Sequence, residues 1–151
     1  MPLATVAAGS LLLLGLSLQA MALQERARVS AHERLRREED LLASAAHQLL
    51  AVLNGSHPCL LLLPLGRWPA EGAACSTPQV AETLTRLEVW SEPVRVLDWR
   101  PEADGASAAL DVQLVAEVGR APRRGRFGVR LIGSPPQAVE LRLRDLAGAL
   151  P

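Results

Sequence analysis

Residues 9–50 read GSLLLLGLSLQAMALQERARVSAHERLRREEDLLASAAHQLL, and this stretch decides the expected fold. An uncharged run passes into a charged block with no turn residue between them. Leucines then recur at helical spacing, at Leu35, Leu42 and Leu49. No proline interrupts residues 3–53, and Asn54-Gly55 is a typical helix stop. The pattern predicts one continuous helix from the apolar run to this stop.

The apolar run at residues 3–23 contains no charged side chain. A bilayer core about 30 Å thick is spanned by roughly 20 helical residues, so residues 1–23 are predicted to form a transmembrane stem. Two alternatives stay open. A signal peptide would be cleaved beside the small residues Ala20 and Ala22, although no Lys or Arg precedes the run. A helix buried in the core of a globular domain is the other alternative.

Residues 24–53 are predicted to continue the helix in amphipathic form. The block at residues 24–40 carries five arginines against five acidic residues, so it is not a basic patch for anionic lipid or nucleic acid. Opposite charges four residues apart, such as Glu33 and Arg37, are typical of a solvated helix. The leucine stripe needs apolar cover, and we expect it to pack on the domain that follows. A short coiled coil is the alternative, with too few heptads to favour it.

The connecting region at residues 54–93 mixes apolar runs with turn residues. The run CLLLLPL at Cys59–Leu65 predicts a strand or a buried extended segment. Thr77-Pro78 resembles a helix N-cap followed by proline at the first helical position. A short helix is therefore expected from Pro78, leading into a strand near Leu87–Trp90.

The chain has two cysteines, Cys59 and Cys75, and both lie in this connecting region. A small domain with few aromatic residues has a small core, and such domains are often stabilised by disulfides or a bound metal. A disulfide is therefore predicted, and closing a loop of this size contributes about 3 kcal/mol. Two unpaired thiols and a metal site remain open, although no histidine lies at zinc-ligand spacing.

Residues 94–151 are predicted to form a sheet, because apolar and polar side chains alternate at residues 94–99, 108–118, 126–133 and 138–145. A solvent-exposed face and a buried face, called the dry face below, are typical of an antiparallel sheet that packs against a hydrophobic core. The dry face is expected to contain Val94, Val96, Leu110, Val112, Leu114, Ala116, Val139, Leu141 and Leu143. Strict alternation places Leu97 and Trp99 on the other face. The expected fold class is α+β: a long N-terminal helix, membrane-spanning in its first half, packs by its second half on a small antiparallel β-meander.

No combination of side chains in the sequence resembles a catalytic site. Serine and histidine do not pair with a third orienting group, and there is no glycine-rich phosphate loop. We therefore expect no enzyme activity, no cofactor, no metal and no small-molecule ligand. A basic hairpin loop contains Arg120, Arg123, Arg124 and Arg126. Because the net charge is zero and the loop lacks aromatic residues, contact with nucleic acid is the less favoured interpretation.

The text of residues 9–50, with Ala22-Leu23-Gln24 closing the apolar run, resembles the first helix of type IV pilin-like proteins. This family includes the minor pilins and the minor pseudopilins of type II secretion. The resemblance implies a structural subunit of a pilus or secretion filament, which contacts other pilin-like subunits through its apolar helix. It also implies single-pass anchorage in the inner (cytoplasmic) membrane, with the head on the extracytoplasmic side.

The resemblance is divergent at the leader. In the family a basic leader ends in Gly before Phe or Met, and Glu occupies the fifth mature position. Here Ser10 follows Gly9, Leu14 takes the fifth position, and no leader-peptidase site is recognisable. Arginines after the run favour a cytoplasmic head by the positive-inside rule, whereas the possible disulfide and the family architecture favour an exported one. A single-pass or secreted binding module, unrelated to filaments, is the alternative function.

Overall fold

The structure is a computed structural model that describes the backbone of residues 2–72, 75–115 and 121–147, and within these ranges the side chains from Gln19 to Leu146. The helices are α1 (Pro2–Ser56), the 3-10 turns η1 (Pro58–Leu62) and η2 (Leu65–Arg67), α2 (Trp68–Glu71) and α3 (Pro78–Leu84). The strands are β1 (Arg86–Val89), β2 (Glu92–Pro101), β3 (Ser107–Leu114), β4 (Arg124–Ile132) and β5 (Gln137–Ala147). The chain forms two compact units, Met1–Arg37 and Glu38–Pro151.

The first unit consists of α1 up to Arg37. Every side chain from Gln19 to Arg37 is exposed, and the large apolar Met21 has an exposed fraction of 66%. Within the part of the chain whose side chains are described, no helix is long and apolar enough to cross a membrane. The predicted stem at residues 1–23 falls mostly outside that part, because the described side chains begin at Gln19.

Leu35, the first leucine of the predicted stripe, differs from Leu42 and Leu49 in its exposure. Its side chain is 41% exposed, and it belongs to the first unit. The residues three and four positions later on the helix are Glu38 and Glu39, whose carboxylates offer no apolar partner. The buried part of the stripe therefore begins only at Leu41.

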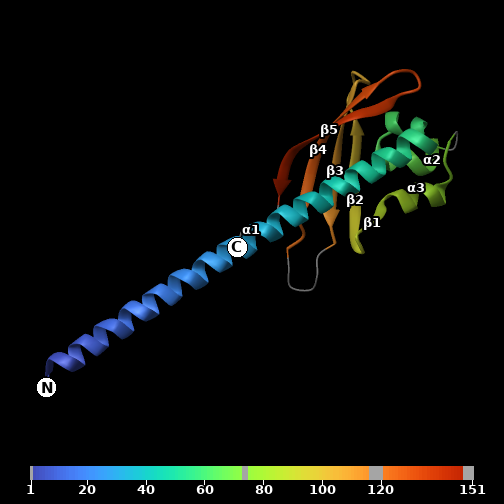
Figure 1. Cartoon of the computed structure of the whole chain (residues 1–151). Coiled ribbons are helices and arrows are strands. Elements are labelled where there is room, and N and C mark those ends of the chain that lie inside the picture. The colour runs from blue at the N-terminus through green and yellow to red at the C-terminus, as the bar shows by residue number, and fades with distance from the viewer. Residues whose placement is uncertain (1, 73–74, 116–120, 148–151) are drawn as a thin grey trace. The chain divides into compact units, whose positions relative to one another are not determined.

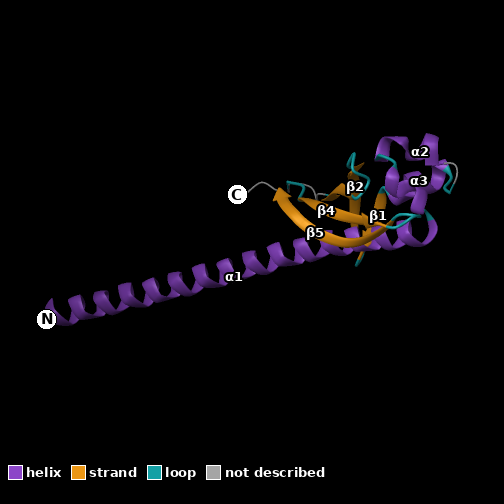
Figure 2. Ribbon diagram, turned by 90° about the horizontal axis from the view of Figure 1, so that it is seen from above, coloured by secondary structure: helices purple, strands orange, loops and turns teal. Residues whose placement is uncertain are grey.

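The second unit contains a five-stranded antiparallel sheet in the order β1-β2-β3-β4-β5. Each strand pairs with its neighbour in the sequence, so the sheet is a meander (Figure 1). The last turns of α1 lie along one face of this sheet (Figure 2). These features confirm an α+β fold with a long N-terminal helix and a small antiparallel meander. The sheet begins at Arg86, earlier than the boundary at residue 94, and α1 ends at Ser56 rather than at residue 53.

The core of this unit lies between residues 41–53 of α1 and the inner face of the sheet. The helix contributes the fully buried side chains Leu42, Ala45, Ala46, Leu49 and Leu53. The sheet contributes Val94, Val96, Trp99, Ala108, Leu110, Val112, Phe127, Val129 and Leu131. Each buried Leu, Val or Phe side chain stabilises the fold by roughly 1.5–3 kcal/mol relative to an exposed one. The apolar faces of α1 and the sheet thus hold the head together.

Trp99 is buried on the inner face of the sheet, although strict alternation placed it opposite Val94 and Val96. The register of β2 against β3 shifts between Val96 and Asp98. One extra residue at such a bulge reverses the alternation that follows it, because side chains in a strand point to opposite faces with a period of two. The Trp99 indole N–H donates to the carbonyl of Leu61 at 3.2 Å, so the buried indole also has a polar partner.

The edge strand β5 is less buried than its alternation predicted. Val139 and Leu143 are exposed, and only Leu141 packs partly against the core. The register of β5 against β4 shifts twice, between Arg126 and Phe127 and between Arg130 and Leu131. The shift between Arg130 and Leu131 sets Val139 out of step, whereas Leu141 and Leu143 pair in regular register with the buried Val129 and Phe127 and share their face. Because β5 is an edge strand, Leu143 on that face is still 38% exposed. Ala116, also predicted to face the core, lies outside the described residues.

The run CLLLLPL was predicted to be a strand or a buried extended segment, but its first four residues lie in the 3-10 turn η1 and only Leu63 and Pro64 are extended. Pro58 stands at the first position of η1, where the fixed φ of proline favours a helical turn. Leu60 and Leu61 are buried, and the carbonyl of Leu60 accepts a hydrogen bond from the Trp68 indole at 3.1 Å. Further along, the helix expected from Pro78 is confirmed as α3, with the Thr77 hydroxyl accepting from the Val80 N–H at its N-terminus.

Candidate interaction site

The end of α1 is joined to the edge strand β5 through Asn54. Its Nδ2 donates to the carbonyl oxygen of Ala138 at 2.9 Å, and its Oδ1 accepts from the Ala138 N–H at 2.7 Å. Both hydrogen bonds are partly buried, which strengthens them relative to exposed ones. The sequence marks Asn54 as a helix stop, but its partner lies 84 positions away and becomes visible only in the fold.

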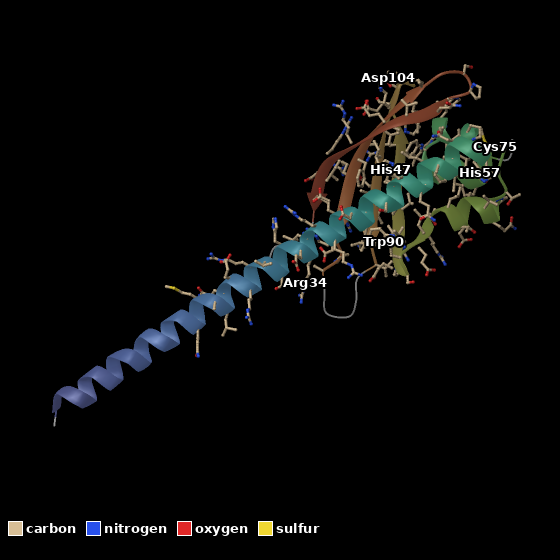
Figure 3. All side chains as sticks on the ribbon, in the orientation of Figure 1. Arg34, His47, His57, Cys75, Trp90 and Asp104 are labelled. Carbon is tan, nitrogen blue, oxygen red and sulfur yellow. A yellow bond between two sulfur atoms is a disulfide. The ribbon has the colours of Figure 1, made fainter. Side chains whose placement is uncertain are left out.

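A disulfide joins Cys59 and Cys75, whose Cα atoms are 6.2 Å apart. It connects η1 with the segment that precedes α3. His57 lies beside it, with Nδ1 2.6 Å from the carbonyl oxygen of Cys75 (Figure 3). Because a carbonyl only accepts, His57 must carry its proton on Nδ1 in this contact. The imidazole therefore supports the disulfide-linked segment.

The predicted basic loop does not present its arginines as one group. Arg120 lies outside the described residues. The guanidinium of Arg123 is only 18% exposed and lies 2.9 Å from the carboxylate of Glu38 on α1. Arg124 is exposed at the start of β4.

Arg126 binds the carboxylate of Asp111 with two hydrogen bonds of 2.8 and 3.1 Å across the β3–β4 ladder. The hydrogen bond to Asp111, and then its negative charge, raise the pKa of the Arg126 guanidinium. Arg123 and Arg126 are thus each engaged by a carboxylate, and they point to different neighbours. These contacts are typical of a solvated strand connection rather than of a phosphate-binding loop.

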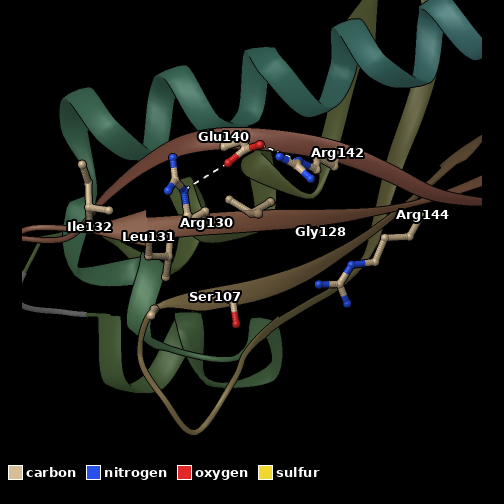
Figure 4. Close-up of a pocket in the computed structure, with 10 residues that line it drawn as sticks. Ser107, Gly128, Arg130, Leu131, Ile132, Glu140, Arg142 and Arg144 are labelled. Atoms are coloured by element: carbon tan, nitrogen blue, oxygen red, sulfur yellow. Dashed lines mark hydrogen bonds and ion pairs between the residues drawn. The ribbon is translucent and has the colours of Figure 1, made fainter.

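The outer face of β4 and β5 contains a hollow of about 390 Å³, which we name the arginine basin (Figure 4). It is lined by Ala106, Ser107, Gly128, Val129, Arg130, Leu131, Ile132, Glu140, Arg142 and Arg144. The Arg144 guanidinium lies directly over Gly128, in space that a Cβ at this position would occupy. Three arginines against one glutamate give the lining a positive balance.

Glu140 lies between two of these arginines. Its carboxylate is 3.1 Å from Nε of Arg130 and also pairs with Arg142. Among the described residues, Arg144 has a long ionic contact of 3.8 Å to Glu102. The side chains of all three arginines are more than half exposed, so these ion pairs contribute little to stability and exchange readily with other partners.

Sequence reasoning missed the arginine basin, although one signal pointed to it. Gly128 and Arg130 alternate along β4, and Arg142 lies in the neighbouring strand β5. Alternate residues of a strand share a face, so this spacing collects arginines around a glycine on the solvent-exposed side. A glycine inside a strand often marks a place where another group approaches closely.

The turn between β1 and β2 carries the exposed side chain of Trp90, with an exposed fraction of 64% (Figure 3). Trp90 and Ser91 both have positive φ angles, of 51° and 67°. We name these two residues the Trp90 tip. Two-residue hairpins of this kind favour Asn-Gly, because few side chains tolerate positive φ. A tryptophan at such a position is strained, and its indole makes no contribution to the core.

The described side chains contain no cluster of three His, Cys, Asp or Glu residues that would bind a metal ion. Among the same residues, no charged side chain is buried. The described surface includes two features that are suited to contact with another molecule, the arginine basin and the Trp90 tip. Comparison of the chain with protein-family models, with curated proteins and with solved structures gives no match.

Proposed function

We propose that the chain is a non-enzymatic, membrane-anchored envelope protein that acts as a pilin-like structural subunit. The observation that carries this proposal is the change of environment along α1. Every described side chain of α1 before Glu38 is exposed, whereas Leu42 and Leu49 are completely buried. A helix gains most of its stability from packing one of its faces against other structure, and water alone does not provide this. We expect the exposed part to be covered by helices of neighbouring subunits.

The uncharged residues 3–23 lead into this exposed part and are proposed as the anchor. Before assembly the bilayer would cover them, and in a filament the stems of other subunits would do so. Ser10 and Leu14 differ from the family pattern at the leader, so the proposal does not include cleavage by a leader peptidase.

The head is proposed to lie on the extracytoplasmic side of the inner membrane. Disulfides form and persist in oxidising compartments, and the chain pairs its two cysteines, Cys59 and Cys75. We give the disulfide more weight than the arginines after the apolar run, which favour a cytoplasmic head by the positive-inside rule. A disulfide would be reduced in the cytosol. The head then presents its outer sheet face to partners in the envelope.

A second candidate is a single-pass or secreted binding module that does not form filaments. The arginine basin favours it, because a positively balanced hollow is suited to ligand contact. The two candidates differ in what touches the stem. A filament subunit contacts other stems, whereas a binding module contacts only lipid, or nothing after secretion.

The test is fractionation and photo-cross-linking of the full chain in cells. Leu13→Arg is expected to abolish membrane insertion, because an arginine at mid-span costs about 2.5–3.5 kcal/mol. Leu13→Ile is the matched control and should remain in the membrane. A photo-reactive residue at position 16 should trap other subunits, and one at the exposed Gln48 should not. An intact wild-type chain in the soluble fraction would refute the anchor, and a stem that traps no protein would favour the binding module.

A further inference from the structure

We propose that two copies of this chain associate head to tail, with the Trp90 tip of one copy seated in the arginine basin of the next. The inference deepens the proposed function and rests on it for its biological setting, because repeated contacts of this kind extend a filament. The contact itself involves only residues of the strands and of the turns between them. It can therefore be measured separately from anchorage.

The first step is the strain at the Trp90 tip. Positive φ is a genuine outlier for a bulky residue, and such strain clusters at functional positions. The turn would form more readily with Asn-Gly, so folding does not explain the tryptophan. Exposed tryptophans are among the side chains most often found at the centre of protein interfaces. Trp90 is therefore suited to bind in a pocket of another molecule.

The second step is the fit of the arginine basin to an indole. Ile132, which lines this hollow, is 52% exposed, and the guanidinium of Arg144 lies over Gly128. The guanidinium groups of Arg142 and Arg144 border the same hollow and are free to rearrange. A guanidinium stacks on the face of an indole and is attracted by its π-electrons. The hollow thus combines apolar surface with cations suited to tryptophan.

The third step is charge. Glu88 and Glu92 lie two residues before and after Trp90. The arginine basin has three arginines and one glutamate. An acidic tip and a positively balanced hollow are complementary, which favours this pairing and its orientation. The net charge of the whole chain is zero, so two copies do not repel each other at long range.

The topology of the sheet prevents the Trp90 tip of a copy from reaching the arginine basin of the same copy, so the tip that fills the basin belongs to a second copy. The Trp90 tip lies at the β1–β2 turn, at one end of the meander. The arginine basin adjoins Ala106 in the β2–β3 turn and Ile132 at the end of β4, which lie at the opposite end. The two surfaces of one copy therefore cannot meet. A contact between two different patches repeats from copy to copy without closing, as in a filament.

The experiment uses full-length chains in cell membranes, one tagged copy carrying Ser91→Cys and a differently tagged copy carrying Ile132→Cys. Oxidation is expected to link the two tags, and a single chain with both cysteines should form a ladder of multimers. Gln79→Cys, on the exposed surface of α3, replaces Ser91→Cys as the matched control and should not link.

Trp90→Asn tests the anchor itself. Asn suits the turn, so the variant should remain folded while cross-linking falls at least about tenfold, the change expected from losing an interface tryptophan. Arg144→Glu should lower the yield in the same direction, because it reverses a charge in the basin. Unchanged cross-linking in Trp90→Asn, or equal cross-linking from position 79, would overturn the proposal.

The outcomes also separate this inference from the proposed function. Cross-links through position 16 without any through positions 91 and 132 would leave the filament subunit standing and refute the head-to-tail contact. The reverse result would support the contact and refute assembly through the stem. Stabilisation of the wild-type chain by inorganic phosphate, lost in Arg144→Glu and without cross-linking at the tip, would make the basin an anion site and overturn the proposal.

Discussion

Replacing Leu49 by alanine tests the helix–sheet interface that holds the head together. The Leu49 side chain is completely buried and belongs to the core cluster formed by α1 and the sheet. Truncation removes the transfer free energy of its buried carbons and leaves a cavity. Substitutions of this kind cost about 2–5 kcal/mol. Since whole domains are stable by only about 5–15 kcal/mol, the loss is a large fraction of the total.

The assay is urea and thermal unfolding of the full chain in detergent micelles. The buried indoles of Trp68 and Trp99 provide the fluorescence signal for unfolding of the head. One kcal/mol shifts the Tm of a small domain by roughly 4–8 °C, so Leu49→Ala should lower the Tm by at least about 8 °C.

Leu35→Ala is the matched control, because it removes the same atoms from the same stripe. Leu35 is 41% exposed, so its truncation should change stability by no more than about 0.5 kcal/mol. Equal losses for the two variants would contradict the burial that the structure gives them. A loss below about 1 kcal/mol for Leu49→Ala would likewise refute the interface as the main source of stability.

Three further predictions concern single contacts of the head. Asn54→Ala leaves the backbone of β5 without two partly buried partners and should cost about 1–3 kcal/mol in urea unfolding, with Asn54→Asp recovering only the acceptor half. Cys59→Ser together with Cys75→Ser should cost about 3 kcal/mol, and non-reducing mass mapping of protein from its native compartment should show the bridge; two alkylatable thiols would contradict it. Trp90→Asn should raise the free energy of unfolding by about 1 kcal/mol, because it relieves strain at positive φ; a destabilised variant would show that the indole supports the fold.

The helix and most strands follow from patterns that the sequence displays directly. A stripe at helical spacing predicts the buried face of α1 from Leu42 onward, and alternation predicts β3, where Leu110 and Val112 are buried. The Thr77-Pro78 pair predicts the start of α3 because the capping interaction is local. In each case the deciding interaction lies within a few residues along the chain.

Most of the failures have a different cause, because they depend on a residue far away in the sequence. The bulge that turns Trp99 inward is a property of the β2–β3 pairing and leaves no mark on the alternation of β2 alone. The turn η1 is an exception with local causes: Pro58 begins it, and the Trp68 indole nearby donates to the carbonyls of Leu60 and Leu63. Asn54 is recognised as a helix stop, but its second role requires Ala138. The arginine basin likewise exists only once β4 and β5 pair.

The two faces of the sheet therefore have separable roles. The inner face and α1 exclude water over Leu42, Leu49 and Phe127, and truncation there costs stability. The outer face carries Arg130, Arg142 and their shared partner Glu140 in exposed pairs, each worth about 0–1 kcal/mol. Residues of the outer face can therefore change to suit contacts with other molecules without unfolding the head. The strained Trp90 tip is the exception, since its conformation opposes folding, and it is for this reason the most informative position at which to look for a partner.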